Sequence, residues 1–261
     1  MPAMNSHAHV PDWTLVSLRP RGQHAPLRRA AEPLGAQVIG LSPWALQPLD
    51  DAATRAALAR ALGADRVVFS SPAAVHAAAR LQPLDGAHSG LWLAVGAGTA
   101  AALRGHGAAG VLAPTRMDSE GLLDLPALAQ LQGLRAALVT APGGRGIIAA
   151  TLQARGATLE RVDVYRRTTL RLPPRQLQRL RRQAGPWVLA LSSGEALSLL
   201  TDQLPTDLLA RLRHAHVVAA SARLAALATG AGFTRVTLAD GPLPEQLAQA
   251  AHAAITIAET S

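Results

Sequence analysis

Apolar segments of strand length alternate with alanine- and leucine-rich segments of helical length along most of the chain. Segments such as "DDAATRAALARALG" begin with aspartate and end with glycine, as helices do. Strict alternation of strands and helices is typical of parallel sheets with helices on both faces, so the sequence predicts an α/β protein. The expected strands lie over 14–18, 36–41, 66–69, 91–95, 109–113, 135–140, 158–165, 187–191, 216–220 and 235–239.

Features of the first half of the chain return in the second half. The glycine turn at Gly35 corresponds to that at Gly156, a step of 121, and Ser70 corresponds to Ser192, a step of 122. Each half resembles a small doubly wound sheet, in which ligands bind beyond the carboxyl ends of the strands.

Small and hydroxyl-bearing residues follow the expected strands at those carboxyl ends. They are Ser70 and Ser71, Gly96 to Thr99, Gly143 to Arg145, Ser192 and Ser193, and Ser221. The N-termini of helices bind anionic groups through free amides, without needing a particular side chain. Several such turns at one edge would suit a ligand with many carboxylates.

The net charge of +8 comes entirely from arginine, because the sequence contains no lysine. A basic surface attracts polyanions such as nucleic acid or a polycarboxylate. The arginines are scattered, and the four Trp, two Phe and one Tyr offer few rings for stacking on bases, so we expect no nucleic-acid partner. The absence of cysteine excludes disulfides, thiolate metal sites and a cysteine nucleophile.

The chain shows no segment near the roughly 18 apolar residues of a membrane-spanning helix, and its start lacks the apolar core of a signal peptide. We therefore expect a cytoplasmic protein that does not bind membranes, with a disordered tail over 1–13. We also expect a monomer.

Conventional catalytic motifs are missing from the sequence, among them Gly-x-Ser-x-Gly, His-Glu-x-x-His and a phosphate loop ending in Gly-Lys. The histidine spacings give no convincing metal site. "AVGAGTAAAL" (94–103) matches the dinucleotide fingerprint formally, but no acidic residue ends the next expected strand to hold a ribose. We interpret Gly96 and Gly98 as positions where the N-terminus of a helix comes close to a ligand or a neighbouring strand.

The succession of motifs resembles the uroporphyrinogen-III synthase family over roughly residues 14–258. Each motif alone is unspecific, but their order and spacing agree with the family. The segments are "LRPRGQ", "LGAQVIGLSP", "VFSSPAAV", "AVGAGTAAAL", "DSEGLL", "GGRGIIAATLQARGATLERVDVYRR" and "LALSSGEAL".

The resemblance implies two flavodoxin-like domains joined by a two-stranded linker, with the ligand cleft between them. It implies a discontinuous domain of residues 1–43 and 171–261 and an inserted domain of residues 44–170. Two contiguous halves would instead give a boundary near residue 130. The crossovers would lie near 41–46 and 165–170, and two such linkers would act as a hinge.

The resemblance also implies a lyase that works without a cofactor. Such an enzyme closes the linear tetrapyrrole hydroxymethylbilane into uroporphyrinogen III, with loss of water and inversion of ring D through a spiro intermediate. The hydroxyl leaves an electron-rich pyrrole readily, so that positioning supplies much of the rate. Arginines and helix amides would bind the substrate's carboxylates.

Tyr165 lies where the family has a tyrosine beside the cleft, and it is the candidate catalytic residue. Its phenol would assist departure of the hydroxyl, or the side chain would only pack in the linker. Ser221 and Arg223 stand where many relatives carry a glycine and threonines. The candidate substrate-binding residues are Arg19, Ser70, Ser71, Gly96, Thr99, Ser119, Gly144, Arg145, Ser192, Ser193 and Ser221.

Two other functions stay open at this point. A two-lobed binding module without catalysis would share the architecture, although the missing signal peptide and the missing DNA-reading domain argue against it. A nucleotide-dependent enzyme would use Gly96 and Gly98, and tight binding of NAD or a flavin would favour it.

Overall fold

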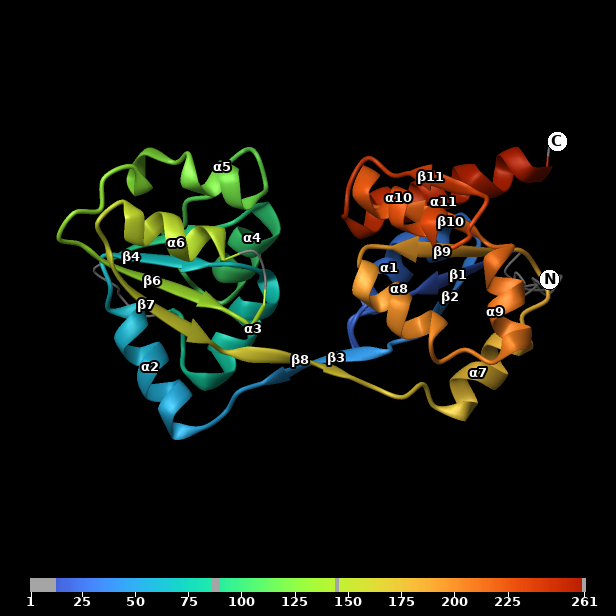
Figure 1. The fold of residues 1–261 in the computed structure, drawn as a ribbon, viewed down its shortest axis with the longest axis horizontal. Coiled ribbons are helices and arrows are strands. Elements are labelled where there is room, and N and C mark those ends of the chain that lie inside the picture. The colour runs from blue at the N-terminus through green and yellow to red at the C-terminus, as the bar shows by residue number, and fades with distance from the viewer. Residues whose placement is uncertain (1–12, 86–89, 144–145, 260–261) are drawn as a thin grey trace, which may run out of the picture. The chain divides into compact units, whose positions relative to one another are not determined.

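The computed structural model describes residues 13–85, 90–143 and 146–259 (Figure 1). The chain divides into two compact units. Unit 1 comprises Met1–Ala45 and Thr168–Ser261, and unit 2 comprises Leu46–Arg167. Within the described residues, no helix combines the length and the apolar character needed to cross a membrane.

Unit 1 is built on a five-stranded parallel sheet in the order β11-β10-β9-β1-β2. One face is covered by α1 and α11, and the other by α7, α8, α9 and α10. The strands are β1 (Trp13–Ser17), β2 (Ala36–Gly40), β9 (Trp187–Leu191), β10 (His216–Ala219) and β11 (Val236–Leu238). The helices are α1 (Ala25–Ala31), α7 (Pro174–Arg181), α8 (Gly194–Thr201), α9 (Thr206–Arg213), α10 (Ala222–Gly230) and α11 (Pro244–Glu259), with a short 3₁₀ turn at Glu32–Leu34.

Unit 2 is built on a four-stranded parallel sheet in the order β5-β4-β6-β7. Helices α2, α3 and α4 cover one face, and α5, α6 and a 3₁₀ turn at Pro126–Leu128 cover the other. The strands are β4 (Arg66–Phe69), β5 (Leu91–Ala94), β6 (Arg135–Thr140) and β7 (Thr158–Asp163). The helices are α2 (Ala52–Leu62), α3 (Pro72–Leu81), α4 (Ala97–Gly105), α5 (Ser119–Leu123) and α6 (Ile147–Ala154).

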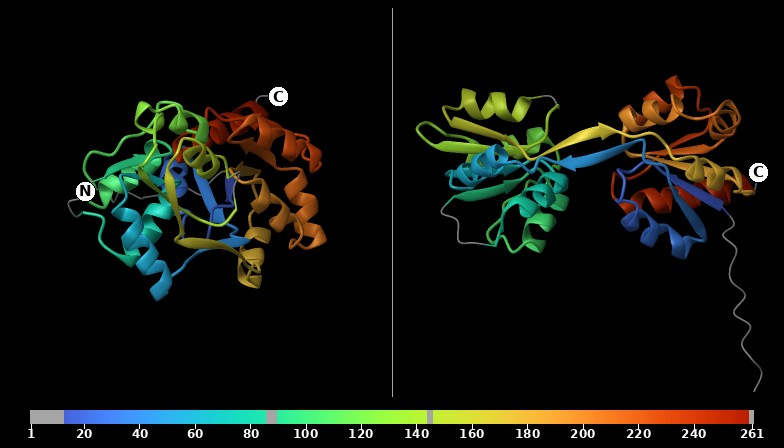
Figure 2. Two further views of the ribbon diagram at one scale, coloured as in Figure 1. Left: turned by 60° about the vertical axis from the view of Figure 1, so that its left-hand side comes forward. Right: turned by 90° about the horizontal axis from the view of Figure 1, so that it is seen from below.

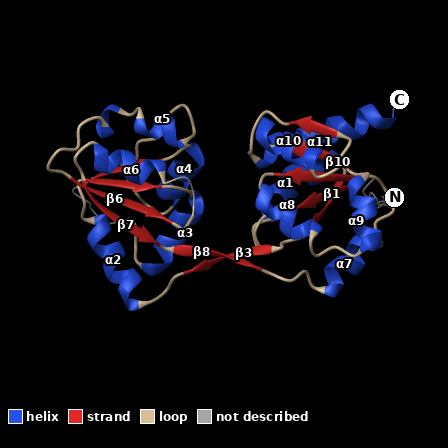
Figure 3. Cartoon of the chain, in the orientation of Figure 1, coloured by secondary structure: helices blue, strands red, loops and turns tan. Residues whose placement is uncertain are grey.

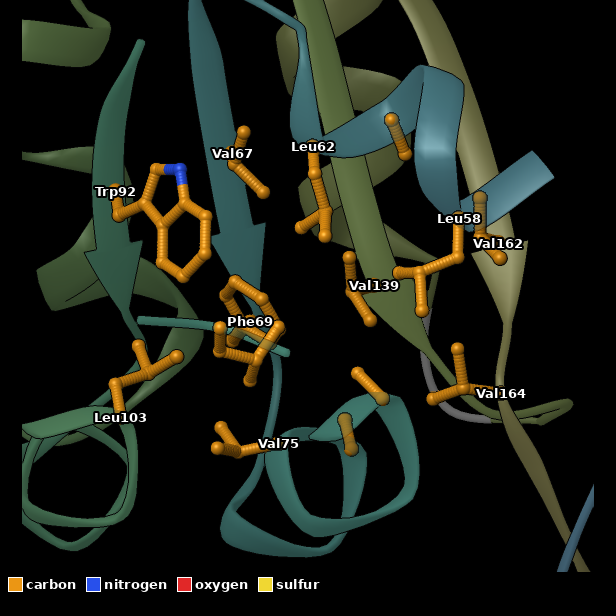
Figure 4. Packing of buried hydrophobic residues seen from close by; sticks show 14 of the residues in the cluster. Leu58, Leu62, Val67, Phe69, Val75, Trp92, Leu103, Val139, Val162 and Val164 are labelled. Atoms are coloured by element: carbon orange, nitrogen blue, oxygen red, sulfur yellow. The ribbon is translucent and has the colours of Figure 1, made fainter. Parts of the chain in front are cut away.

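Burial on both faces explains why the strands read as continuous apolar runs. Successive residues of a strand point to opposite faces, so Val67 joins the cluster with α2, α3 and α4, whereas Val68 joins the cluster with α5 and α6. Figure 4 shows Val67, Phe69 and Trp92 in the first of these clusters. The two doubly wound parallel sheets confirm the predicted fold class.

A separate two-stranded sheet is formed by β3 (Trp44–Pro48) and β8 (Tyr165–Thr169) (Figures 2 and 3). Leu49 N donates to Val164 O at 3.0 Å and Leu170 N donates to Pro43 O at 2.7 Å, so the two strands run antiparallel. The crossover segment predicted near 165–170 contains β8, and the one predicted near 41–46 overlaps the first residues of β3. The predicted hinge and the ligand cleft stay predictions.

Two predicted strands and the predicted tail differ from the structure. Only Leu112 of the expected strand 109–113 makes a bridge, to Leu93, because Gly110 (φ 64°) turns the chain just before it. The expected strand 158–165 is interrupted at Val164, which leaves the edge of the unit 2 sheet. Trp13, assigned to the tail, is the buried first residue of β1, whereas residues 1–12 lie outside the described part.

The glycine turn that recurs in the sequence has the same backbone conformation in both copies. Gly35 has φ 78° and Gly156 has φ 89°, in the left-handed region that favours glycine. A Cβ at Gly156 would also lie 2.1 Å from Oε1 and 3.0 Å from Cα of Gln132. Glycine at 156 therefore meets both a conformational and a packing requirement.

We predict that Gly156→Ala lowers the free energy of unfolding by at least about 1–2 kcal/mol, the cost of a left-handed conformation for an L-residue. Gly105→Ala is the matched control, because Gly105 ends α4 and a Cβ there would meet nothing within 4 Å. Urea unfolding of both variants measures the difference. Equal stability of the two variants would contradict the assignment.

Candidate active site

A pocket of about 250 Å³ lies at the carboxyl ends of the unit 2 strands. Parallel pairing brings those ends to one edge of the sheet, where the helices that follow begin. Four of the predicted site residues line this pocket, namely Ser70, Ser71, Ser119 and Tyr165. The structure thus brings together residues that lie up to 95 positions apart in the sequence.

Ser71 is the N-cap of α3, and its Oγ accepts a hydrogen bond from Ala74 N at 3.1 Å. The hydroxyl of Tyr165 lies 3.3 Å from the same Oγ. The ring of Tyr165 belongs to the unit 2 core and the residue is only 6% exposed. Packing of the ring therefore fixes the hydroxyl at the pocket wall.

Ser70 links the ends of two neighbouring strands. Its Oγ donates to Thr140 Oγ1 at 2.8 Å, which joins the end of β4 to the end of β6. Thr140 also lines the pocket and was not among the predicted residues. Its place as the last residue of the strand "RAALVT" is the signal that could have identified it.

Two arginines line the pocket and were likewise missed. Arg161 donates from Nε to Asp163 Oδ1 at 3.1 Å and from Nη2 to Ala141 O at 3.0 Å. Arg167 lines the pocket from β8. No Asp or Glu of the described residues lines this pocket, although Asp163 beside it pairs with Arg161 at 3.1 Å.

Gly96 and Thr99 do not line the pocket. Gly96 is the N-cap of α4, and a Cβ there would lie 3.0 Å from Cβ of Met117. Thr99 is inside α4 and only 4% exposed. A side chain at Gly96 would thus be in tight contact with Met117.

The remaining predicted serines lie at the strand ends of unit 1. Ser193 caps α8 by accepting from Ala196 N at 3.3 Å, and Ser221 caps α10 by accepting from Leu224 N at 3.4 Å. Ser192 is exposed beside Ser193. These turns repeat in unit 1 the arrangement of Ser71 in unit 2.

Arg19 follows β1 in unit 1. Its Nε is buried and has no hydrogen-bond partner among the described residues, and Nη2 donates to Pro242 O at 3.5 Å. Burial lowers the pKa of Arg19, whereas the carboxylate of Glu245 acts in the opposite direction. The guanidinium of Arg19 therefore has an unused donor, Nε, in a partly desolvated place.

Gly144 and Arg145 lie outside the described residues. Over the described ranges, no group of three or more His, Cys, Asp or Glu side chains could hold a metal ion. The hydroxyls, arginines and capped helix N-termini described above are thus the chemical groups that the structure offers at the strand ends.

Comparison with known proteins identifies relatives in sequence. The family model described as uroporphyrinogen-III synthase HemD (HEM4) matches residues 25–249. The Escherichia coli (strain K12) uroporphyrinogen-III synthase is 34% identical over 152 residues, which cover 57% of this chain and 61% of the relative. The Salmonella typhimurium (strain LT2) enzyme is 32% identical over 123 residues, which cover 47% and 50%. The matches thus span half to about three-fifths of these relatives.

Two solved structures share the fold over nearly their whole length. A mutant uroporphyrinogen III synthase of the extremely thermophilic bacterium Thermus thermophilus has a TM-score of 0.57 at 19% identity, covering 94% of this chain and 99% of the other. The Helicobacter pylori 26695 uroporphyrinogen-III synthetase has a TM-score of 0.58 at 15% identity, covering 92% and 98%. Since the family model matches most of the chain, the protein belongs to the uroporphyrinogen-III synthase family.

Proposed function

We propose that this protein is a uroporphyrinogen-III synthase. The reaction closes hydroxymethylbilane into uroporphyrinogen III with loss of water and inversion of ring D through a spiro intermediate. Beside the family membership, one observation carries the proposal: the unit 2 pocket places the Tyr165 hydroxyl in a wall that also holds Arg161 and Arg167.

The chemistry needs few reacting groups from the protein. The hydroxyl leaves from an electron-rich pyrrole, and the resulting azafulvene is reactive without a strong acid or base. Tyr165 supports the first step as a hydrogen-bond donor to the departing hydroxyl. Its partner Ser71 accepts from Ala74 N and holds the phenol at 3.3 Å. Positioning of the bound chain supplies the rest of the rate.

The arginines account for recognition of an acidic substrate. A guanidinium binds a carboxylate through two parallel donors, and free helix amides add further contacts. Arg161, which also pairs with Asp163, and Arg167 supply guanidinium groups at the unit 2 pocket. In unit 1, Arg19 supplies a guanidinium whose buried Nε has no hydrogen-bond partner among the described residues. The serine caps Ser193 and Ser221 mark helix N-termini at the strand ends of unit 1.

The direct test of the function is the identity of the product. We expect the purified protein, given freshly prepared hydroxymethylbilane, to form the type III isomer, because only ring inversion gives that arrangement of side chains. Chromatographic separation of the isomers measures it. A product mixture identical to the type I product of an enzyme-free control would refute the proposal.

For Tyr165→Phe we predict a loss of turnover of about ten- to a hundredfold and a smaller change in KM. The phenol would act on bond breaking, whereas binding rests on the carboxylate contacts elsewhere. The type III outcome should stay intact, because inversion depends on how the chain is curled. Steady-state kinetics with isomer analysis measure both effects.

The control for this variant is Ser71→Ala, which removes the partner hydroxyl and leaves the phenol in place. It should reduce turnover less than Tyr165→Phe does. Unchanged turnover in a Tyr165→Phe protein of normal melting temperature would assign Tyr165 to packing alone.

Arg167→Gln should raise KM about tenfold or more and change kcat little, because a hydrogen bond to a charged group contributes about 1.5–3 kcal/mol. Arg166→Gln is the matched control, since Arg166 is the neighbour on the same strand and donates to Gln47 at 3.0 Å outside the pocket. Steady-state kinetics of both variants give the comparison. Equal KM values for the two variants would exclude Arg167 from substrate binding.

A further inference from the structure

His24 connects three parts of unit 1 around Arg19. It occupies the N-cap position of α1, with Nδ1 2.9 Å from Ser17 Oγ and Nε2 2.8 Å from Ser42 Oγ. Ser17 ends β1 and Ser42 follows β2, and both serines are buried. The imidazole thus joins the ends of two neighbouring strands.

The direction of each hydrogen bond follows from a third contact. The hydroxyl of Ser42 donates to the carbonyl oxygen of Arg19 at 2.8 Å, so its oxygen is left to accept from His24. His24 must then carry its proton on Nε2, and Nδ1 must accept from the hydroxyl of Ser17. The result is a chain of three hydrogen bonds that starts at Ser17 and ends at the main chain of Arg19.

This chain requires a neutral imidazole. Burial lowers the pKa of His24 to about 4, and the neighbouring charges of Arg28 and Arg19 act in the same direction. A protonated ring would donate from both nitrogens, and Ser17 would then have to turn its hydroxyl proton away. At neutral pH the ring therefore keeps the single tautomer that the contacts demand.

The main chain at Gly40 passes close to the imidazole ring of His24. Gly40 ends β2, and a Cβ at that position would lie 2.5 Å from Nε2 of His24. The backbone of β2 and the imidazole are therefore in direct contact, which leaves the ring little freedom to turn. Glycine is required here by close approach.

Little else holds the Arg19 side chain in place. Among the described residues its guanidinium makes one hydrogen bond, the 3.5 Å contact to Pro242 O, and its Nε has no partner. The direction in which the side chain leaves the loop is thus set by its main chain. That main chain is fixed at the carbonyl by Ser42.

We propose that His24 is a positioning residue that acts through Ser42 to orient Arg19 toward a carboxylate of the substrate. The inference rests on the proposed function, in which Arg19 binds the substrate. Because the loop that carries Arg19 is already held in place in the free protein, binding of the substrate loses less conformational entropy there. His24 itself does not touch the reacting atoms.

The first test compares His24→Leu, Ser42→Ala and His24→Gln in steady-state kinetics with hydroxymethylbilane. His24→Leu and Ser42→Ala should each raise KM about tenfold and change kcat less than twofold, because a contact that positions a binding group is lost. His24→Gln should restore KM to within about threefold of the unsubstituted protein, since its amide can still donate to Ser42. His214→Leu, at an exposed histidine of unit 1, is the control and should leave KM unchanged.

The second test separates positioning from general destabilisation. In an Arg19→Ala background, adding His24→Leu should leave KM where Arg19→Ala alone sets it, because the group that His24 positions is gone. A further rise in KM by the same factor as in the unsubstituted protein would overturn the proposal. If His24→Leu fails to fold, the same cycle with Ser42→Ala, which removes a single hydroxyl, decides the question.

The two proposals fail in different ways. A protein that forms no type III isomer contradicts the synthase function. A protein that forms the type III isomer with the same KM in Ser42→Ala and the unsubstituted chain contradicts the positioning role alone.

Discussion

Parallel pairing of the strands is the constraint on which the rest of the structure depends. It obliges each strand of a sheet to end at the same edge, and it requires a crossover helix that starts there. The serines at these turns cap the helices by accepting hydrogen bonds from free amides, and they also place hydroxyls at the edge that carries the candidate site. The opposite edge carries structural contacts instead, such as Arg211, which donates to the carbonyls of Ala184 and Gly185 and stacks on Trp187 at 4.0 Å.

The break between β7 and β8 at Val164 determines the position of Tyr165. Val164 N donates to Thr140 O at 2.9 Å and its carbonyl accepts from Leu49 N at 3.0 Å, so the chain passes there from β6 to the neighbourhood of β3. Tyr165 is thereby the first residue of β8, with its ring in the unit 2 core and its hydroxyl beside Ser71. The two interpretations of Tyr165, packing and chemistry, are compatible because they concern different ends of one side chain.

The fold class and the edge that carries the candidate site were predictable because they depend on local periodicity and on the residues that follow each strand. Periodicity alone did not indicate the pairing of β3 with β8, since "WALQP" lacks a buried apolar run and is only half-buried in the structure. The two-stranded linker was expected from the family resemblance instead. The contacts of His24 were not predictable. They join residues 7 and 18 positions away and depend on the close approach of Gly40, which no spacing in the sequence indicates.

The recurrence of features at about 122 residues has a consequence for the order in which the chain folds. Strands β1 and β2 correspond by this interval to β6 and β7, and β4 and β5 correspond to β9 and β10, so each unit combines strands from both halves of the sequence. Unit 2 is contiguous and can complete its sheet once Arg167 has been synthesised. In unit 1, β1 can pair with β9 only much later, because Trp187, the partner of Thr14, lies 173 residues further along the chain. During that interval the edge of β1 that later pairs with β9 is open, and open strand edges are sites of wrong pairing.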